Sequence, residues 1–255
     1  MKMQNDLDRI VQWSLEWQML FNVLKCKTMH FGKKNCCHDY QMNGVTLESV
    51  EEEKDLGVII TSDLKVSSQC AQAYSKANKM LGVINRTIKY KSEKVMMSLY
   101  KTLVRPHLEF CTAAWSPHYQ KDKVIIEKIQ HRFTRMMHGY KEKPYEDRLS
   151  QLGLWSLEER RNRADLIEVF KMYHGLSKLS FGTFFEMCQS DRTRGHALKL
   201  VKHRSKTDLR QHFFSERVVN RWNRLDEDTV SATSLGVFKS RLTQMRRTKT
   251  GLFTD

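Results

Sequence analysis

Cysteine and histidine side chains gather in one short stretch near the N-terminus, where they pose the question of a metal site. The stretch follows the pattern C-x3-H-x5-C-C-H and contains Cys26, His30, Cys36, Cys37 and His38. Zinc modules use two separated pairs of ligands. Here the three adjacent residues would strain to reach one ion, and no second pair follows. The pattern therefore predicts no metal site, and Cys26 is expected to pack as a small apolar side chain.

Patterns typical of a complete active site are missing from the sequence. There is no G-x-S-x-G motif, no catalytic arrangement of cysteine with histidine and carboxylate, and no glycine-rich loop that would hold a phosphate. Two-metal nucleotidyl transfer needs carboxylates on neighbouring strands. Asp6 and Asp8 instead fall on a predicted helix, and residues 226–228 follow another one. We therefore expect a chain that is not an enzyme by itself, with no catalytic residue and no cofactor.

Basic side chains give the strongest functional signal. The net charge is +15, and residues 1–65 hold 8 Lys and Arg against 10 Asp and Glu, whereas residues 66–255 hold 36 against 19. Such an uneven excess favours contact with a polyanion, and the alternative is a solvated helical surface. Three clusters predict non-specific binding to the backbone of RNA or DNA. They are Lys121, Lys128, Arg132 and Arg135 on one predicted helical face; Arg160, Arg161 and Arg163 at a helix start; and Arg204 with Lys206.

The first 65 residues are predicted to contain one helix. Residues 3–20 carry an apolar stripe at helical spacing, with Trp13 and Trp17 four residues apart beside it. The stripe is expected to be a packing face. Its members are Leu7, Ile10, Val11, Leu15 and Met19.

About three short antiparallel strands are predicted after that helix. Residues 27–31 alternate in a strand-like pattern, and Asn43-Gly44 favours the type I′ turn of a hairpin. Residues 55–60 indicate a third strand, reached through an acidic turn at residues 51–53.

From residue 66 onward the apolar spacing is helical almost throughout. A stretch at residues 188–207 lacks periodicity and is expected to be a loop with a short strand. The predicted helices cover residues 70–88, 95–103 (bent or ended before Pro106), 124–138 (ended by Gly139), 157–175 (opened by a capping box at Ser156–Glu159), 213–225 and 235–245.

The predicted fold class is therefore α+β, with a small antiparallel hairpin and helix region followed by a mostly helical body. The regions expected are 1–65, a helical region at 66–140 and a basic helical region at 141–255. No apolar run reaches the roughly 18–20 residues of a membrane span, and the six cysteines follow no disulfide framework. We expect no membrane partner and an intracellular protein, nuclear or cytoplasmic.

The order of these features resembles the C-terminal part of the reverse transcriptases of non-LTR (LINE-type, jockey-like) retrotransposons. Residues 4–32 look like the helix and strand that follow the catalytic hairpin of the polymerase palm, with Asn22, Lys25 and Cys26 at the family's motif D. Residues 54–58, KDLGV, are similar to motif E, the primer-grip hairpin. The regions 66–140 and 141–255 resemble the thumb and the C-terminal tail.

The resemblance implies roles for four residues. Lys25 would lie near the incoming nucleotide. Leu56, Gly57 and Val58 would belong to the primer grip.

In that family the fingers, the palm aspartates and the Tyr-x-Asp-Asp hairpin precede the position of Gln4. The resemblance therefore implies a truncated RNA-directed DNA polymerase that binds template-primer nucleic acid without polymerising. The missing palm and fingers would be a further partner. Two alternatives stay open: a non-functional product of a fossil element, and a co-opted module that binds proteins through exposed apolar faces.

Overall fold

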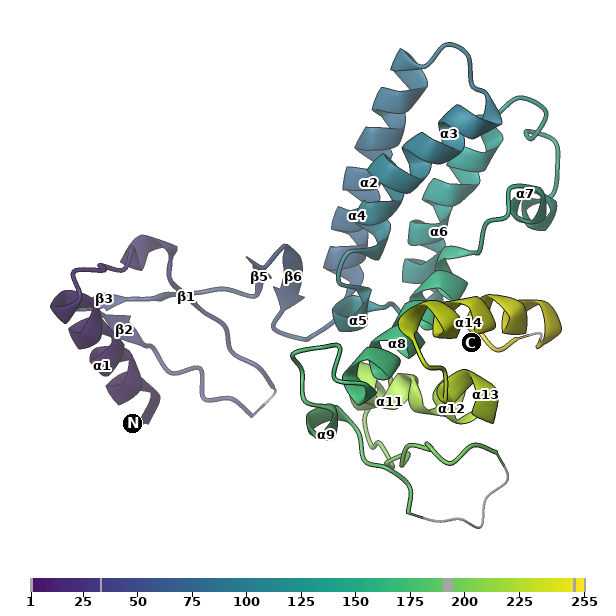
Figure 1. Cartoon of the computed structure of the whole chain (residues 1–255). Helices are drawn as coiled ribbons and strands as arrows, with labels where there is room; N and C mark the ends of the chain where they lie inside the picture. Colours follow the sequence, from purple (N-terminus) through teal and green to yellow (C-terminus); the bar gives the residue numbers. More distant parts are fainter. Residues whose placement is uncertain (1, 33, 190–194, 250, 255) are drawn as a thin grey trace. The chain divides into compact units, whose positions relative to one another are not determined.

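The computed structural model describes residues 2–32, 34–189, 195–249 and 251–254. The chain separates into two compact units, Met1–Gln69 and Cys70–Asp255 (Figure 1). The division falls in the first turn of helix α2 (Ser67–Thr87), close to the expected limit at residue 65. Residues 70–255 form one unit, although the sequence suggests two regions there. The structure is mostly helical with a few short strands in small sheets, which agrees with a coarse α+β class.

Unit 1 combines one helix, one 3₁₀ turn and short strands in pairs. The helix is α1 (Lys2–Glu16) and the 3₁₀ turn is η1 (Val23–Lys25). The strands form the pairs β1–β4, β2–β3 and β5–β6. Their bounds are β1 (Lys27–Thr28), β2 (Gln41–Met42), β3 (Val45–Thr46), β4 (Glu48–Ser49), β5 (Glu52–Asp55) and β6 (Val58–Thr61).

The predicted hairpin at Asn43-Gly44 is confirmed. Met42 pairs with Val45 in antiparallel register, and the two turn residues have φ angles of 53° and 74°. Positive φ at both central positions is the type I′ geometry that matches the twist of the flanking strands. The pairing of β1 with β4 is parallel, so the expectation of antiparallel strands is wrong for that pair.

The predicted single strand over residues 55–60 is a hairpin instead. The chain turns at Leu56 and Gly57, whose φ angles are 44° and 91°, and β5 pairs antiparallel with β6. Residues 52–55 are therefore a strand and not the expected acidic turn. The physical reason is Gly57, which adopts a left-handed backbone without a side-chain clash and so allows a two-residue turn.

The apolar stripe of α1 is not a covered packing face. Ile10, Trp13 and Leu15 are each nearly half exposed, and Trp17 is 66% exposed. The helix is instead attached to β2 by polar contacts, since the Gln4 side-chain amide donates to the Gln41 carbonyl at 2.8 Å and accepts from its N–H at 3.0 Å. A large exposed apolar surface is therefore a property of this helix.

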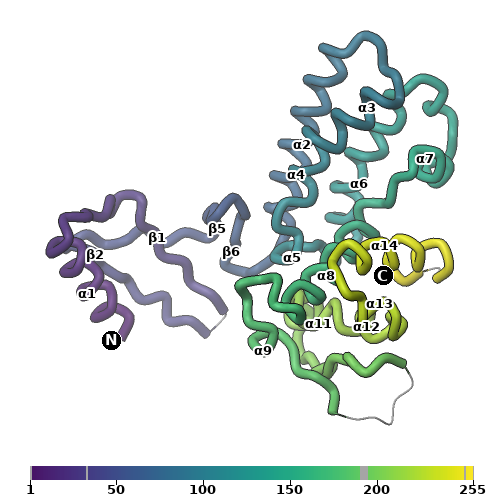
Figure 2. The backbone as a smooth tube through the Cα atoms, viewed as in Figure 1, coloured from purple at the N-terminus to yellow at the C-terminus, as the bar shows by residue number. Residues whose placement is uncertain are grey.

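Unit 2 is built from helices. In Figures 1 and 2, α2, α4 and α6 run alongside one another, and α8 with α11 to α14 forms a second group. After α2 the helices are α3 (Glu93–Leu99), the π-helix η2 (Tyr100–Val104), α4 (Arg105–Glu109), α5 (Thr112–Trp115), α6 (Gln120–Arg135), α7 (Tyr145–Gln151), α8 (Leu157–Tyr173), α9 (Phe181–Phe184), α10 (Asp208–Gln211), α11 (Phe214–Arg217), α12 (Val219–Asn223), α13 (Glu227–Val230) and α14 (Leu235–Thr248).

Helical structure continues past Pro106, where the sequence predicts a bend or an end. Pro106 lies in the first turn of α4, and the π-helix η2 joins α3 to α4. Proline is tolerated in a first helical turn because its missing N–H has no intrahelical partner there. The predicted helix over 213–225 is likewise divided, into α11 and α12.

The capping box of α8 is confirmed. The Glu159 N–H donates to Ser156 Oγ at 3.1 Å, and the Ser156 N–H donates to the Glu159 carboxylate at 2.8 Å. This helix forms the centre of the second group. Its buried Leu166, Val169 and Phe170 pack in one core with side chains of α12 and α14. Met187, which directly precedes the predicted loop at 188–207, pairs with Leu200 in an isolated bridge, and residues 190–194 lie outside the described residues.

Candidate nucleic-acid interface

An open groove lies beside α6 in unit 2. Its volume is about 590 Å³. Three of the basic residues predicted on the α6 face, Lys128, Arg132 and Arg135, line the groove, and all three are exposed. The other lining residues are Tyr74, Gln120, Lys123, Val124, Glu127, His131, Tyr145, Ser156 and Glu158.

Packing on the opposite side of α6 fixes the direction of this basic face. Ile126, Ile129 and Phe133 are completely buried. The Phe133 ring stacks on Tyr100 of η2 with 4.2 Å between centroids. Because an α-helix has 3.6 residues per turn, residues 128, 132 and 135 then face outward. Lys121 is also exposed, but it lies outside the lining.

Arg132 is oriented by a contact with α2. Its Nη1 donates a hydrogen bond to Oδ1 of Asn78. A guanidinium has five N–H donors, so this bond orients the group and leaves donors for a ligand. Guanidinium groups bind phosphate oxygens in a planar, two-pronged geometry, which suits a backbone contact.

Aromatic rings lie beside these cations. His131 stacks on Tyr145 with 3.5 Å between centroids and 18° between planes, and Tyr74 of α2 also lines the groove. Tyr74, His131 and Tyr145 together form what we call the aromatic wall of the groove. Arg148, which is buried, places its guanidinium 5.2 Å from the Tyr145 ring and supports this wall. Grooves that combine cations with aromatic faces bind nucleic-acid strands because bases stack on the rings while phosphates contact the cations.

Two carboxylates also line the groove, and both are engaged with the protein. Glu158 pairs with Lys123 at 2.8 Å. Glu127 accepts a hydrogen bond from the Leu157 N–H at 3.0 Å and another from the Tyr145 hydroxyl. Burial raises the pKa of the Glu127 carboxyl, against the hydrogen bonds that it accepts. The positive character of the groove therefore comes from the α6 side chains.

In the predicted cluster on α8, Arg160 and Arg163 are engaged in contacts within unit 2, and Arg161 is buried. Arg160 forms two hydrogen bonds with the Glu109 carboxylate, and Arg161 is 2% exposed. Arg163 lies 5.2 Å from the Trp155 ring and donates to the Lys239 carbonyl at 3.0 Å. Arg160 and Arg163 are therefore half-buried and Arg161 is buried, because α8 is central and packs against neighbours on several sides.

The other predicted residues do not join the groove. Arg204 and Lys206 are exposed in the coil before α10, and neither lines it. Lys25 is exposed at the end of η1 in unit 1. In the β5–β6 hairpin, Leu56 is 88% exposed at the turn, beside Gly57, whereas Val58 is 6% exposed.

Sequence reasoning missed the aromatic wall. Tyr74 and Tyr145 come from helices on either side of α6 in the sequence, and no local pattern connects them with the basic face. His131 was within the predicted helix, but its stacking partner is 14 residues away. Only the packing of α2, α6 and α7 shows these rings together.

Among the described residues, no helix is both long enough and apolar enough to cross a membrane. The chain matches no family model, and no curated protein and no solved structure is significantly similar to it.

Proposed function

We propose that unit 2 binds the backbone of RNA or DNA without sequence preference, as the C-terminal part of a reverse transcriptase of the non-LTR type. The observation that carries the binding proposal is the exposed row Lys128, Arg132 and Arg135 beside the aromatic wall of the groove. The order of sequence features supports the family part of the proposal.

The spacing of this row suits a short stretch of one strand. Arg135 follows Lys128 by seven positions, so the row is about 10 Å long at the rise of an α-helix. A nucleic-acid strand advances roughly 3.4 Å per nucleotide along a duplex, so about three phosphates fall within that length. The chain would therefore neutralise about three phosphates through this face.

Salt-dependent binding tests the proposal directly. The full chain is titrated against a fluorescent RNA–DNA hybrid at several salt concentrations. Each phosphate contact contributes a slope of roughly −0.7 to −0.9 to the plot of log affinity against log salt, so three contacts predict about −2 to −3. Hybrids of scrambled sequence should bind equally well. A flat salt dependence would contradict the proposal.

A second candidate function is the binding of a protein partner by unit 1. The observation that favours it is the exposed apolar surface of α1 and of the turn after it, including Trp13 and Trp17. Association with another protein through this surface should survive nuclease treatment. It should be lost in a Trp13→Ser, Trp17→Ser variant and retained when Arg132 and Arg135 are replaced. The opposite pattern would assign the association to bound nucleic acid.

A further inference from the structure

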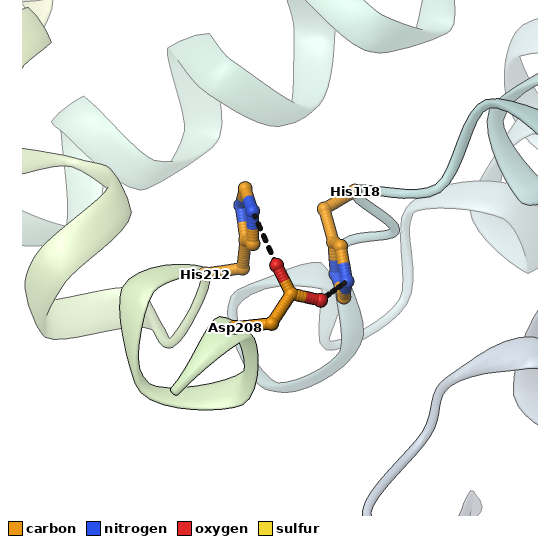
Figure 3. A group of neighbouring side chains, drawn as sticks. All are labelled: His118, Asp208 and His212. Atoms are coloured by element: carbon orange, nitrogen blue, oxygen red, sulfur yellow. Dashed lines mark hydrogen bonds and ion pairs between the residues drawn. The ribbon is translucent and has the colours of Figure 1, made fainter. Parts of the chain in front are cut away.

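Two histidines and one aspartate from distant parts of the chain meet at one point of unit 2 (Figure 3). The Nε2 atom of His118 lies 3.0 Å from Oδ2 of Asp208, 90 residues further along the chain. The Nε2 atom of His212 lies 3.3 Å from Oδ1 of the same carboxylate. The two imidazole rings are parallel within 3°, with 4.1 Å between their centroids.

The short helix α10 places Asp208 and His212 on the same side of the cluster. Asp208 is the first residue of α10, and His212 is its C-cap, so the spacing of four residues puts both side chains on the same face. Thr207 caps the helix by accepting a hydrogen bond from the Arg210 N–H at 3.3 Å. His118 lies in the segment between α5 and α6 and approaches from the other side (Figure 3).

We propose that His118, Asp208 and His212 form a binding site for a divalent transition-metal ion, with Zn²⁺ as the expected occupant. Two imidazole nitrogens and one carboxylate oxygen are a ligand set that zinc uses when a fourth position is left to water. An exposed aspartate is ionised at neutral pH, and it would supply the charge that favours a cation.

The distances are close to those that coordination requires. All three ligand atoms lie within 4.8 Å of one another. In a tetrahedral zinc site with bonds of about 2.0–2.2 Å, ligand atoms are roughly 3.3–3.6 Å apart. The nitrogen–oxygen separations of 3.0 Å and 3.3 Å are near that range, and they run to the two different oxygens of the Asp208 carboxylate. The two imidazole rings are stacked and parallel, so at least one of them would have to rotate to point its in-plane lone pair at the same ion as the other.

Tyr119 provides the outer support that metal ligands usually have. Its hydroxyl donates to Oδ2 of Asp208 at 2.9 Å and so restricts the orientation of the carboxylate. The Asp208 side chain is 55% exposed and that of His212 is 34% exposed. Water can therefore reach the site and complete the coordination of the ion.

Cations near the site are paired with carboxylates, which limits their repulsion of a metal ion. Lys123 pairs with Glu158 at 2.8 Å. Arg217 forms two hydrogen bonds with Asp165, at 2.8 Å and 2.9 Å. A bound ion would connect the segment before α6 to α10, and this role is independent of nucleic-acid binding.

Zinc titration of the purified, metal-free full chain tests the site. A competing chromophoric zinc indicator should report one ion bound per chain after the cysteines have been alkylated. Replacement of His118 by Gln, of Asp208 by Asn or of His212 by Gln should each weaken zinc binding at least tenfold. The exposed His138, replaced by Gln, is the matched control and should leave the affinity unchanged.

Cobalt spectra identify the ligands without relying on stability. Co²⁺ bound at this site should show the visible bands of a nitrogen and oxygen site and lack the intense ultraviolet band of thiolate ligands. Replacing both Cys36 and Cys37 by Ser should leave the spectrum unchanged. Urea unfolding without metal checks that each variant folds, and the conservative substitutions of these partly exposed residues should keep the unfolding midpoint.

Three outcomes would overturn the proposal. The first is the absence of stoichiometric zinc binding, which would leave a hydrogen-bonded cluster only. The second is equal binding by the His118, Asp208 and His212 variants and the wild-type chain. The third is a cobalt spectrum with a thiolate band that is lost in the cysteine variant.

Discussion

The buried carboxylate of Asp165 accepts two hydrogen bonds from the guanidinium of Arg217, at 2.8 Å from Nε and 2.9 Å from Nη2. Asp165 lies on α8 and is 1% exposed. Arg217 lies on α11 and also donates to the carbonyl of Ala113 on α5 at 2.9 Å. One ion pair therefore connects three helices of unit 2, and its geometry satisfies most of the polar atoms that it buries.

Replacing Asp165 by Ala should destabilise unit 2 by about 3–5 kcal/mol, because the substitution leaves a buried guanidinium without its counter-charge. The measurement is urea unfolding followed through hydrogen exchange of the α8 amides. Glu142→Gln is the control, since Glu142 is exposed. A loss below about 1 kcal/mol for Asp165→Ala would mean that water or another acceptor replaces the carboxylate.

Two separate interactions at the capping box of α8 contribute to the stability of unit 2. Ser156→Ala should cost about 1 kcal/mol by removing the acceptor for the Glu159 N–H. Glu159→Gln keeps an amide that can serve the cap but loses the charge that binds Arg246 through hydrogen bonds of 2.7 Å and 2.8 Å. The partly exposed ion pair of Glu159 and Arg246 should contribute about 0.5–1 kcal/mol to the free energy of unfolding.

High salt distinguishes the two contributions. It should reduce the destabilisation caused by Glu159→Gln and leave that caused by Ser156→Ala unchanged, as measured by urea unfolding at two salt concentrations. Equal salt sensitivity of the two variants would contradict this separation.

Leu56 is strained at the turn of the β5–β6 hairpin. Its φ angle is 44° and its side chain is 88% exposed, so it has an unfavourable backbone with little burial in return. Leu56→Asn should slow hydrogen exchange of the β6 amides and stabilise the hairpin by about 0.5–1 kcal/mol, because asparagine tolerates this conformation better.

Leu24→Asn is the control for Leu56→Asn. Leu24 is 83% exposed and does not have a positive φ angle, so its replacement should change exchange in β6 little. Faster exchange in the Leu56 variant would show that the leucine stabilises the turn by a contact of its own.

The cysteines should differ sharply in reactivity. Burial raises the pKa of the Cys70 thiol to about 12. Its reactive thiolate is therefore scarce at any pH well below that value, and its side chain is inaccessible. At about pH 8, iodoacetamide should label the exposed Cys36, Cys37 and Cys111 and spare Cys70 until urea is added. Mass spectrometry of peptides measures the labelling, and early modification of Cys70 would contradict its burial.

Replacing Arg132 and Arg135 by Ala should weaken binding to an RNA–DNA hybrid and make the salt slope shallower by roughly 1.5–2, without altering sequence preference. The matched control removes the same charge elsewhere, by replacing the exposed Lys178 and Arg247, which do not line the groove. Fluorescence anisotropy measures both variants. Equal weakening in the two would indicate that net charge, and not the α6 face, determines affinity.

Local sequence patterns predicted those features whose physical cause is local. The capping box at Ser156 depends on residues three apart, and the hairpin at Asn43-Gly44 depends on two turn residues. Lys128, Arg132 and Arg135 face outward on α6 because the apolar residues of this helix recur at helical spacing and face inward. In each case the backbone hydrogen bonds or the period of one element determine the result.

The features that the local patterns did not predict have a different origin. The sequence of α1 contains an apolar stripe, but a stripe does not tell whether anything covers it, and in the structure Trp17 is largely exposed. The arginines of α8 look like a solvated cluster, but Arg161 is buried. In both cases the deciding quantity is the surface covered by other elements, which the local pattern does not contain.

The sequence by itself determined the mixed, mainly helical class, the uneven charge and the basic face of α6. Only the tertiary structure decided which basic residues border a groove, which rings form its wall, and that His118 meets Asp208 and His212. Side chains 90 residues apart come together through the packing of several helices at once, and such long-range contacts leave no trace in the spacing of neighbouring residues.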